Sequence, residues 1–183
     1  GVQTCALPIY SGKPILFPDI TYSFYDVWAE LFQIPYERPA LDDAFALRLE
    51  DYQCENGGIV IANPNAPTGI RQSEEFLRAV IEANPNVVVI IDEAYADFSG
   101  YTALPLVDEY ENVVVVQTFS KSRSMAGMRI GHAIGNAKLI KAMNDVRYSF
   151  NSYPMTRLSV ALGVAALSDQ DYFEETTAKI VAT

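Results

Sequence analysis

The 183 residues allow one domain of ordinary size or a large piece of a bigger one. Half of them (50%) are hydrophobic and a fifth (20%) are charged, a balance typical of a globular protein with a packed core. The formal net charge of −10 argues against nucleic acid or an anionic membrane as a partner, because no basic cluster compensates for it.

Cysteine, histidine and apolar patterns narrow the class of protein further. Cys5 and Cys54 offer neither a disulfide framework nor a C-x-x-C spacing, so we expect a reducing, cytoplasmic location. His132 is the only histidine, which argues against histidine-based metal sites and catalytic triads, and we expect no metal. No apolar run reaches membrane-spanning length, and no signal-peptide pattern is present.

The two ends of the sequence are unusual. Residues 1–9, G-V-Q-T-C-A-L-P-I, match what a widely used sequencing-adapter oligonucleotide would give if translated, so we expect them to be non-native and exclude them from the fold. Residues 178–183 end the chain inside a helical pattern without a cap or stop signal. We therefore expect the sequence to be cut at both ends.

The first elements are a short strand, a helix and a second strand. Residues 15–17 are apolar and indicate a buried strand. Residues 21–32 have helical periodicity with Thr21 as N-cap, which predicts a buried face. That face comprises Phe24, Val27, Trp28, Leu31 and Phe32. Residues 44–49 alternate between apolar and other side chains and predict a half-buried strand.

The middle of the chain alternates strands and helices. Strands are expected at residues 58–62, 87–91 and 113–117, and helices at residues 74–83, capped by Ser73, and at residues 103–110. This is the βαβ rhythm of a sheet with helices on both faces, so the loops that follow the three strands converge on one edge. Beyond them we expect a strand ending at Gly135, a helix capped by Asn136, and a helix over residues 154–167.

The stretch T-F-S-K-S-R-S-M-A-G-M-R-I-G, residues 118–131, lies just past the carboxyl end of the strand 113–117. Open α/β sheets place their chemistry there. Lys121 could form a Schiff base with an aldehyde, and a phosphate on that aldehyde could be held by Thr118, Ser120 and Arg129. The alternative is a flexible basic turn with a solvated lysine. The spacing resembles the S/T-x-S-K-x(7)-R motif of pyridoxal-phosphate enzymes of the aspartate aminotransferase superfamily.

Two further strand ends fit this resemblance. Asp92, at the end of the strand 87–91, could pair with a protonated pyridine nitrogen, and Tyr95 could hydrogen-bond the 3-oxygen of the ring. The alternatives are an N-cap or solvated acid for Asp92 and a packed core aromatic for Tyr95. The loop N-P-N-A-P-T-G, residues 63–69, contains two prolines and a glycine, which fix its backbone as support for a planar ligand.

The motifs N-P-N-A-P-T-G, D-E-A-Y-A-D-F and T-F-S-K-x(4)-A-G-M-R-I-G together resemble the histidinol-phosphate aminotransferase branch of the superfamily. The resemblance implies an incomplete three-layer αβα large domain of the aspartate aminotransferase type (PLP fold type I), with a mostly parallel mixed sheet, over residues 10–183. It implies that the C-terminal small domain is absent, that the full-length protein is a homodimer, and that pyridoxal 5'-phosphate is the cofactor.

The resemblance also implies roles for individual residues. Lys121 would be the Schiff-base lysine and proton shuttle, Asp92 the pyridinium partner, and Tyr95 the donor to the 3-oxygen. The phosphate ligands would be Thr118, Ser120 and Arg129. Tyr22 would stack on the cofactor, although an aromatic residue at this position is equally typical of a packing staple. The family's asparagine before Pro-Thr-Gly is replaced by Ala66, and the neighbouring Asn65 could substitute for it.

The implied reaction transfers an amino group between histidinol phosphate and 2-oxoglutarate, giving imidazole-acetol phosphate and glutamate in histidine biosynthesis. An aromatic-amino-acid aminotransferase and an amino-acid-phosphate decarboxylase are alternatives within the same chemistry. A different alternative is a non-catalytic, doubly wound ligand-binding module, although no G-x-G-x-x-G or P-loop follows any strand. We expect residues 1–183 alone to show no turnover.

Overall fold

The computed structural model describes residues 12–183, without the side chain of Phe150. The expectation that residues 1–9 are non-native lies outside the described residues. The core is a six-stranded sheet in the order β2-β1-β3-β4-β5-β6. The strands are β1 (Ile15–Leu16), β2 (Tyr36–Glu37), β3 (Gly58–Ala62), β4 (Val89–Asp92), β5 (Val113–Thr118) and β6 (Gly131–Gly135).

Five of the strands run parallel and the sixth runs against them. β1 pairs parallel with both β2 and β3, and β3, β4 and β5 pair parallel in turn, whereas β6 pairs antiparallel with β5. The register places Ala62 beside Asp92 and Asp92 beside Val116, so the carboxyl ends of the three central strands lie side by side. This confirms that the loops after these strands meet at one edge of the sheet.

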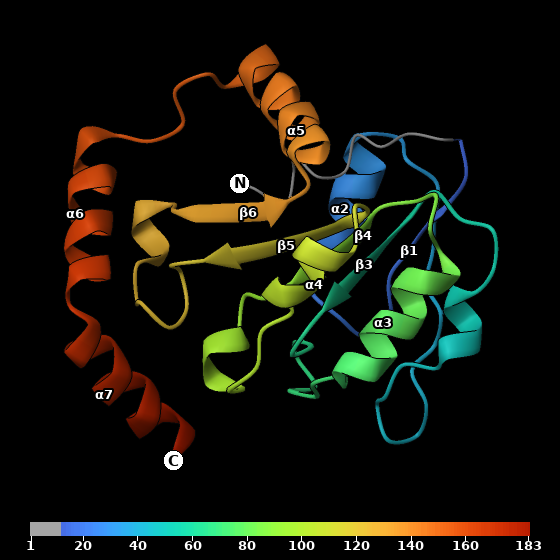
Figure 1. Ribbon diagram of the computed structural model, residues 1–183, viewed down its shortest axis with the longest axis horizontal. Helices are drawn as coiled ribbons and strands as arrows, with labels where there is room; N and C mark the ends of the chain where they lie inside the picture. The colour runs from blue at the N-terminus through green and yellow to red at the C-terminus, as the bar shows by residue number, and fades with distance from the viewer. Residues whose placement is uncertain (1–11) are drawn as a thin grey trace.

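Helices cover both faces of the sheet. On one face, α3 (Glu74–Ala83) and α4 (Leu104–Glu109) pack on alternate strand residues such as Ile59, Ile91 and Val115. On the other face, α2 (Phe24–Leu31) and α5 (Ala137–Phe150) pack on the intervening residues, which include Val60, Ile90 and Val114. Figure 1 shows α3 and α4 in front of the sheet. Because both faces are covered, the central strands are apolar up to their carboxyl ends.

Several local signals are confirmed. The Ser73 side chain accepts a hydrogen bond from the Phe76 backbone N–H at 3.2 Å and so caps α3, whose inner residues are Leu77, Val80 and Ile81. Asn136 caps α5 in the same way through the Lys138 N–H at 2.9 Å. A cap of this kind contributes about 1 kcal/mol to helix stability.

The prediction for the first helix was wrong in its start and in its buried face. The helix begins at Phe24 with Ser23 at the N-cap, because the Thr21 hydroxyl donates to Asn65 Oδ1 at 2.7 Å instead of accepting from the helix. Tyr25 and Ala29 are the buried residues. The predicted face is mostly exposed: Phe24 is 48% exposed, Val27 46%, Leu31 70% and Phe32 47%.

The strand predicted over residues 44–49 is absent, and turn structure stands in its place. The Asp42 side chain accepts from the backbone N–H groups of Ala44 and Ala46, both at 2.8 Å, and Phe45 takes a left-handed conformation with φ of 60°. A local turn organised by Asp42 has replaced the ladder that the alternation suggested. The chain then forms the 3-10 helix η1 (Leu49–Tyr52), with Tyr52 buried.

The last two helices extend from the sheet as an arm. α6 (Arg157–Ser168) and α7 (Gln170–Val181) form what we call the helical arm, which runs down the left side of Figure 1. Within α6 only Ser159 and Gly163 are buried. The Ser159 hydroxyl donates to the Met128 carbonyl at 2.9 Å, and a Cβ on Gly163 would lie 3.0 Å from Ile130 Cδ1. The arm therefore docks on the loop between β5 and β6.

The architecture confirms the predicted three-layer αβα arrangement with a mostly parallel mixed sheet. Over residues 12–183, no helix has the length and apolarity that crossing a membrane would require.

Candidate functional site

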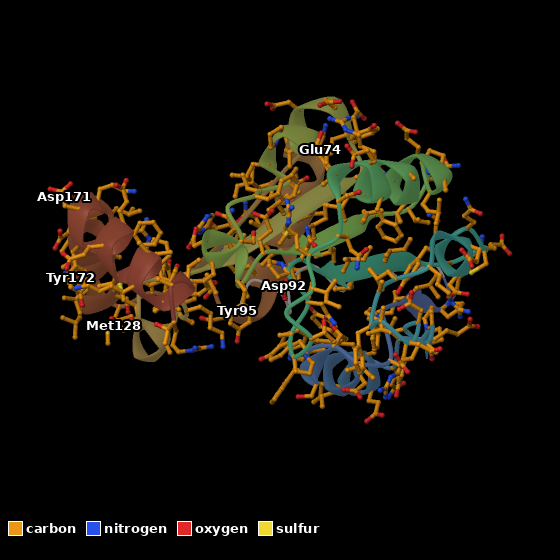
Figure 2. The ribbon with its side chains drawn as sticks, turned by 90° about the horizontal axis from the view of Figure 1, so that it is seen from below. Glu74, Asp92, Tyr95, Met128, Asp171 and Tyr172 are labelled. Carbon is orange, nitrogen blue, oxygen red and sulfur yellow. The ribbon has the colours of Figure 1, made fainter. Side chains whose placement is uncertain are left out.

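A cavity of about 470 Å³ opens at the carboxyl ends of the central strands. Seven of the eight residues singled out from the sequence line it: Tyr22, Asp92, Tyr95, Thr118, Ser120, Lys121 and Arg129. They come from three separate segments of the chain, and the sheet topology brings them together. Figure 2 shows Asp92 and Tyr95 close to one another near the middle of the molecule, with Met128 towards the helical arm.

Asp92 is a buried carboxylate on the last position of β4. Its side chain is 4% exposed, and its Oδ1 accepts from the Ala94 backbone N–H at 3.0 Å. Its Oδ2 accepts from the Tyr25 hydroxyl at 2.7 Å. Burying a carboxylate is costly unless hydrogen bonds or an opposite charge compensate it. Asp92 is therefore neither a solvated acid nor a helix N-cap, and the structure holds it as a fixed acceptor on the cavity wall.

The antiparallel return of β6 explains how Thr118 and Arg129, eleven residues apart in sequence, line the same cavity. Thr118 pairs with Gly131, so the segment between them forms a loop that leaves the sheet at β5 and returns to it at β6. Thr118 Oγ1 lies 3.0 Å from Ser120 Oγ and 3.2 Å from the Ile130 carbonyl, and it accepts from the Ser120 N–H at 3.1 Å. Two hydroxyls and a guanidinium thus line one part of the cavity, a donor set suited to phosphate.

Arg129 adopts a left-handed backbone conformation, with φ of 56° and ψ of 43°. Only a small fraction of residues other than glycine do so, at a cost of order 1–3 kcal/mol, and such residues cluster at binding sites. Its Nη1 donates to the Ala126 carbonyl at 2.9 Å. The side chain is exposed and lines the cavity.

Lys121 is exposed at the cavity, and its ammonium lies 5.0 Å from the centre of the Tyr95 ring. The residues after it are anchored. The Ser122 hydroxyl is buried and donates to the Asp97 carboxylate. Arg123 lies 4.0 Å over the Phe173 ring and donates to the Ala166 carbonyl at 2.8 Å. The flexible basic turn considered from the sequence does not describe this segment, since Ser122 and Arg123 are anchored while Lys121 lines the cavity.

Tyr22 has features of both roles that the sequence left open, a ring beside the cofactor and a packing staple. It lines the cavity with 40% of its surface exposed. It also packs against neighbouring rings, with centroid distances of 5.8 Å to Phe24, 5.6 Å to Tyr25 and 5.9 Å to Trp28. A ring that is held by its neighbours and remains partly exposed at a cavity is available for stacking on a planar ligand.

Asn65 is the residue that the structure does not bring into the cavity. It is 5% exposed, and its amide nitrogen donates to the Ile20 carbonyl at 2.9 Å and to Thr68 Oγ1 at 3.0 Å. Its carbonyl oxygen accepts from Thr21. Ala66 lines the cavity instead. The geometry therefore gives no support to Asn65 as a substitute for the family's asparagine, because its amide is committed to the loop.

Sequence reasoning missed several residues around the cavity. Tyr25 was passed over because it lies outside the apolar stripe of its helix, although a buried tyrosine hydroxyl usually requires a partner. Arg147 and Asn151 line the side of the cavity formed by α5 and the segment after it. Arg147 Nε is buried and makes no hydrogen bond within residues 12–183. No pattern in the sequence distinguished Arg147 from an ordinary helix-surface charge.

Comparison with known proteins assigns the chain to a family. The family model described as aminotransferase class I and II matches residues 2–183. The chain belongs to the class I and II aminotransferase family. It is 51% identical over 170 residues to the histidinol-phosphate aminotransferase of Pseudomonas putida (strain W619), an alignment that covers 93% of this chain and 49% of that protein. The chain spans about half the length of the curated relatives it matches.

Solved structures of class I and II aminotransferases share the fold. The histidinol-phosphate aminotransferase of Sinorhizobium meliloti, solved in complex with pyridoxal-5'-phosphate, superposes with a TM-score of 0.86 at 26% identity, covering 99% of this chain and 50% of that one. The aspartate aminotransferase of Rhizobium meliloti gives a TM-score of 0.83 at 24% identity, covering 97% of this chain and 48% of that one. The predicted aspartate aminotransferase type of fold is confirmed, and it is partial relative to these chains.

The donor set of this aminotransferase chain fits pyridoxal 5'-phosphate by its chemistry. A buried carboxylate, Asp92, suits a cationic ring nitrogen, and the amine of Lys121 suits an aldehyde. The hydroxyls of Thr118 and Ser120 with the Arg129 guanidinium suit a phosphate dianion. The cavity volume lies in the range of small-molecule and cofactor sites.

Proposed function

We propose that this chain forms the pyridoxal 5'-phosphate-binding part of a histidinol-phosphate aminotransferase. The enzyme would transfer the amino group of histidinol phosphate to 2-oxoglutarate, giving imidazole-acetol phosphate and glutamate in histidine biosynthesis. One observation carries the proposal: a single cavity gathers an amine, a buried carboxylate and a phosphate-type donor set from three loops. The identity of close to half of the residues to relatives of that name supports the choice of substrate.

When bound, pyridoxal 5'-phosphate supplies an aldehyde that takes up the substrate amine and a conjugated ring that delocalises the electron pair released at the substrate Cα. The phosphate would be held by Thr118, Ser120 and Arg129. The Asp92 carboxylate would stabilise positive charge in the same cavity, which favours a protonated ring nitrogen. Its burial strengthens this pairing, because the local dielectric constant is lower than that of water.

Lys121 and two tyrosines complete the proposed chemistry. Lys121 is exposed at the cavity, so its Nζ would act as nucleophile toward the aldehyde and then carry a proton to and from the substrate Cα. Tyr95 lines the same cavity as Asp92, and its hydroxyl would donate to the 3-oxygen. The exposed face of Tyr22 would exclude water from one side of the ring.

The domain assignment, assembly and location are part of the same proposal. Residues 10–183 would belong to the large domain, with the small domain outside them. A homodimer of the full-length protein is supported by exposed apolar residues on α2 and α6, such as Leu31 (70%), Leu158 (60%) and Val164 (60%). The exposed free thiol of Cys54 suits a reducing cytoplasm.

The test is an assay of the complete protein with histidinol phosphate and 2-oxoglutarate in the presence of pyridoxal 5'-phosphate. We expect glutamate to form in step with imidazole-acetol phosphate. Parallel reactions with an aromatic amino acid as donor, and a measurement of released carbon dioxide, separate the two related activities. Faster turnover of an aromatic amino acid, or carbon dioxide release without glutamate, would replace the proposed substrate while keeping the cofactor chemistry.

A further inference from the structure

A tyrosine behind the cavity wall contacts the carboxylate at the centre of the proposed site. Tyr25 lies on α2, 67 positions before Asp92 in the sequence, and its hydroxyl donates to Asp92 Oδ2 at 2.7 Å. Tyr25 is 2% exposed and Asp92 is 4% exposed, so the bond is shielded from water. A hydrogen bond to an ionised acceptor in such surroundings is stronger than one between neutral groups.

Neighbouring rings fix the direction of the Tyr25 hydroxyl. Phe17 meets the Tyr25 ring edge to face at a centroid distance of 5.7 Å and an angle of 65°, and Trp28 lies 6.1 Å away. Tyr22 meets the same ring at 5.6 Å and 80°. Burial, followed by the charge of Asp92, raises the pKa of Tyr25 well above its usual value, so the hydroxyl stays neutral and remains a donor.

We propose that Tyr25 is the positioning residue of the site, holding the Asp92 carboxylate toward the cofactor's ring nitrogen while its ring supports Tyr22 beside that same cofactor. The proposal deepens the proposed function and rests on it. A single side chain would thereby set the orientation of both the Asp92 carboxylate and the Tyr22 ring. Both Tyr22 and Asp92 line the cavity, and Tyr25 touches both.

The Tyr25 hydroxyl acts in two ways. It orients the carboxylate, so that the Asp92 oxygen atoms present one geometry to the ring nitrogen. It also stabilises the ionised form of Asp92, because a donor to a carboxylate favours the charged state. Loss of the hydroxyl would leave the carboxylate less well oriented and easier to protonate, which weakens its hold on a protonated ring nitrogen.

The test compares Tyr25→Phe with a matched control in the complete protein. Tyr25→Phe removes one oxygen and keeps the ring that packs on Phe17, Tyr22 and Trp28. Tyr36→Phe is the control: its ring stacks on Phe17 at 5.3 Å, but its hydroxyl donates to Glu30 at 3.1 Å, away from Asp92. We expect kcat to fall about tenfold in Tyr25→Phe, with KM for both substrates within about twofold of wild type and Tyr36→Phe unchanged.

A second readout is independent of turnover. Pyridoxal 5'-phosphate labelled at its ring nitrogen reports by NMR whether that nitrogen carries a proton. We expect the nitrogen signal in Tyr25→Phe to move in the direction that Asp92→Asn moves it, and the signal in Tyr36→Phe to match wild type. A purely structural role for Tyr25 would lower thermal stability without moving this signal.

A double-mutant comparison, made on variants whose thermal stability shows that they are folded, tests whether Tyr25 acts through Asp92. If Tyr25 acts through Asp92, adding Tyr25→Phe to Asp92→Asn should change kcat by less than about twofold. An undiminished effect in the Asp92→Asn background would overturn the assignment, and so would a wild-type nitrogen signal in Tyr25→Phe. Failure of the wild-type protein to bind pyridoxal 5'-phosphate would overturn the proposed function itself, whereas binding with an unaffected Tyr25→Phe would overturn the role of Tyr25 alone.

Discussion

The two walls of the cavity are built in opposite ways. The strand wall, which we define as Asp92 to Tyr95 with Tyr25 behind it, is built around a hydrogen-bonded carboxylate that is only 4% exposed. The loop wall, residues 119–130, presents Lys121 and Arg129 as exposed side chains. It is held from outside the cavity by Ser122 on Asp97 and by Arg123 on the helical arm.

This difference matches the work proposed for each wall. A carboxylate that stabilises a fixed positive charge gains from burial and rigid hydrogen bonds, since reorganisation would weaken it. A lysine that attacks an aldehyde and then moves a proton needs freedom at its end and a fixed backbone beneath it. The fold provides the first on a parallel strand and the second on a loop whose neighbouring residues are anchored.

Lys121→Ala should produce the largest effect, because it removes both the nucleophile and the proton-moving group of the loop wall. We expect kcat in the complete protein to fall by roughly 10³-fold or more. Lys138→Ala, the same change on an exposed residue of α5, is the control and should have no effect on kcat. Turnover of Lys121→Ala at the wild-type rate would remove the lysine from the mechanism.

Asp92→Asn removes the negative charge of the strand wall and keeps the shape of the side chain. The amide cannot hold positive charge as the carboxylate does, so we expect kcat to fall on the order of 10²-fold with KM little changed. Asp108→Asn, on an exposed position of α4, serves as the matched control. If Asp92→Asn instead raised KM and left kcat intact, Asp92 would contribute to substrate binding and not to the chemistry.

Asn65→Ala tests the finding that this residue supports a loop and does not face the cavity. Its loss leaves the Thr21 hydroxyl and the Ile20 carbonyl without their partner, which should lower the free energy of unfolding by about 1–3 kcal/mol. We expect kcat and the affinity for pyridoxal 5'-phosphate to change by less than about twofold. Unaltered stability combined with weakened cofactor binding would show that Asn65 reaches the cofactor after all.

Ser122→Ala tests whether the anchor of the loop wall contributes to cofactor binding. Loss of the bond to Asp97 should lower the free energy of unfolding by about 1 kcal/mol and weaken pyridoxal 5'-phosphate binding by up to about fivefold. Ser124→Ala is the control, since Ser124 is an exposed serine two residues further along the same segment. Equal effects of the two substitutions would show that the anchor at Ser122 has no special role.

The regions that the sequence predicted well are those governed by local or repeating signals. Residues 58–62 and 113–116 are apolar throughout because both sheet faces are covered, and Ser73 and Asn136 cap helices through their own side chains. Seven of the eight expected site residues line one cavity because the ends of parallel strands meet.

The regions it predicted poorly depend on contacts distant in sequence. The apolar stripe of α2 was assigned inward, but the buried side of that helix is set by Tyr25, which reaches Asp92 across the sheet edge. The alternation over residues 44–49 gave way to hydrogen bonds made by Asp42. The sequence does not show that Asn65 is engaged, because two of its three side-chain partners, Ile20 and Thr21, are more than 40 residues away in the chain.

The central claim is that Lys121 and the two walls form one pyridoxal 5'-phosphate site, and chemical trapping tests it most directly. The complete protein is incubated with pyridoxal 5'-phosphate, reduced with borohydride, digested and analysed by mass spectrometry. We predict that the reduced cofactor is found on the peptide that carries Lys121 and that Arg129→Gln diminishes its yield. Modification spread over the exposed lysines Lys138, Lys141 and Lys179, with Lys121 unmodified, would contradict the account.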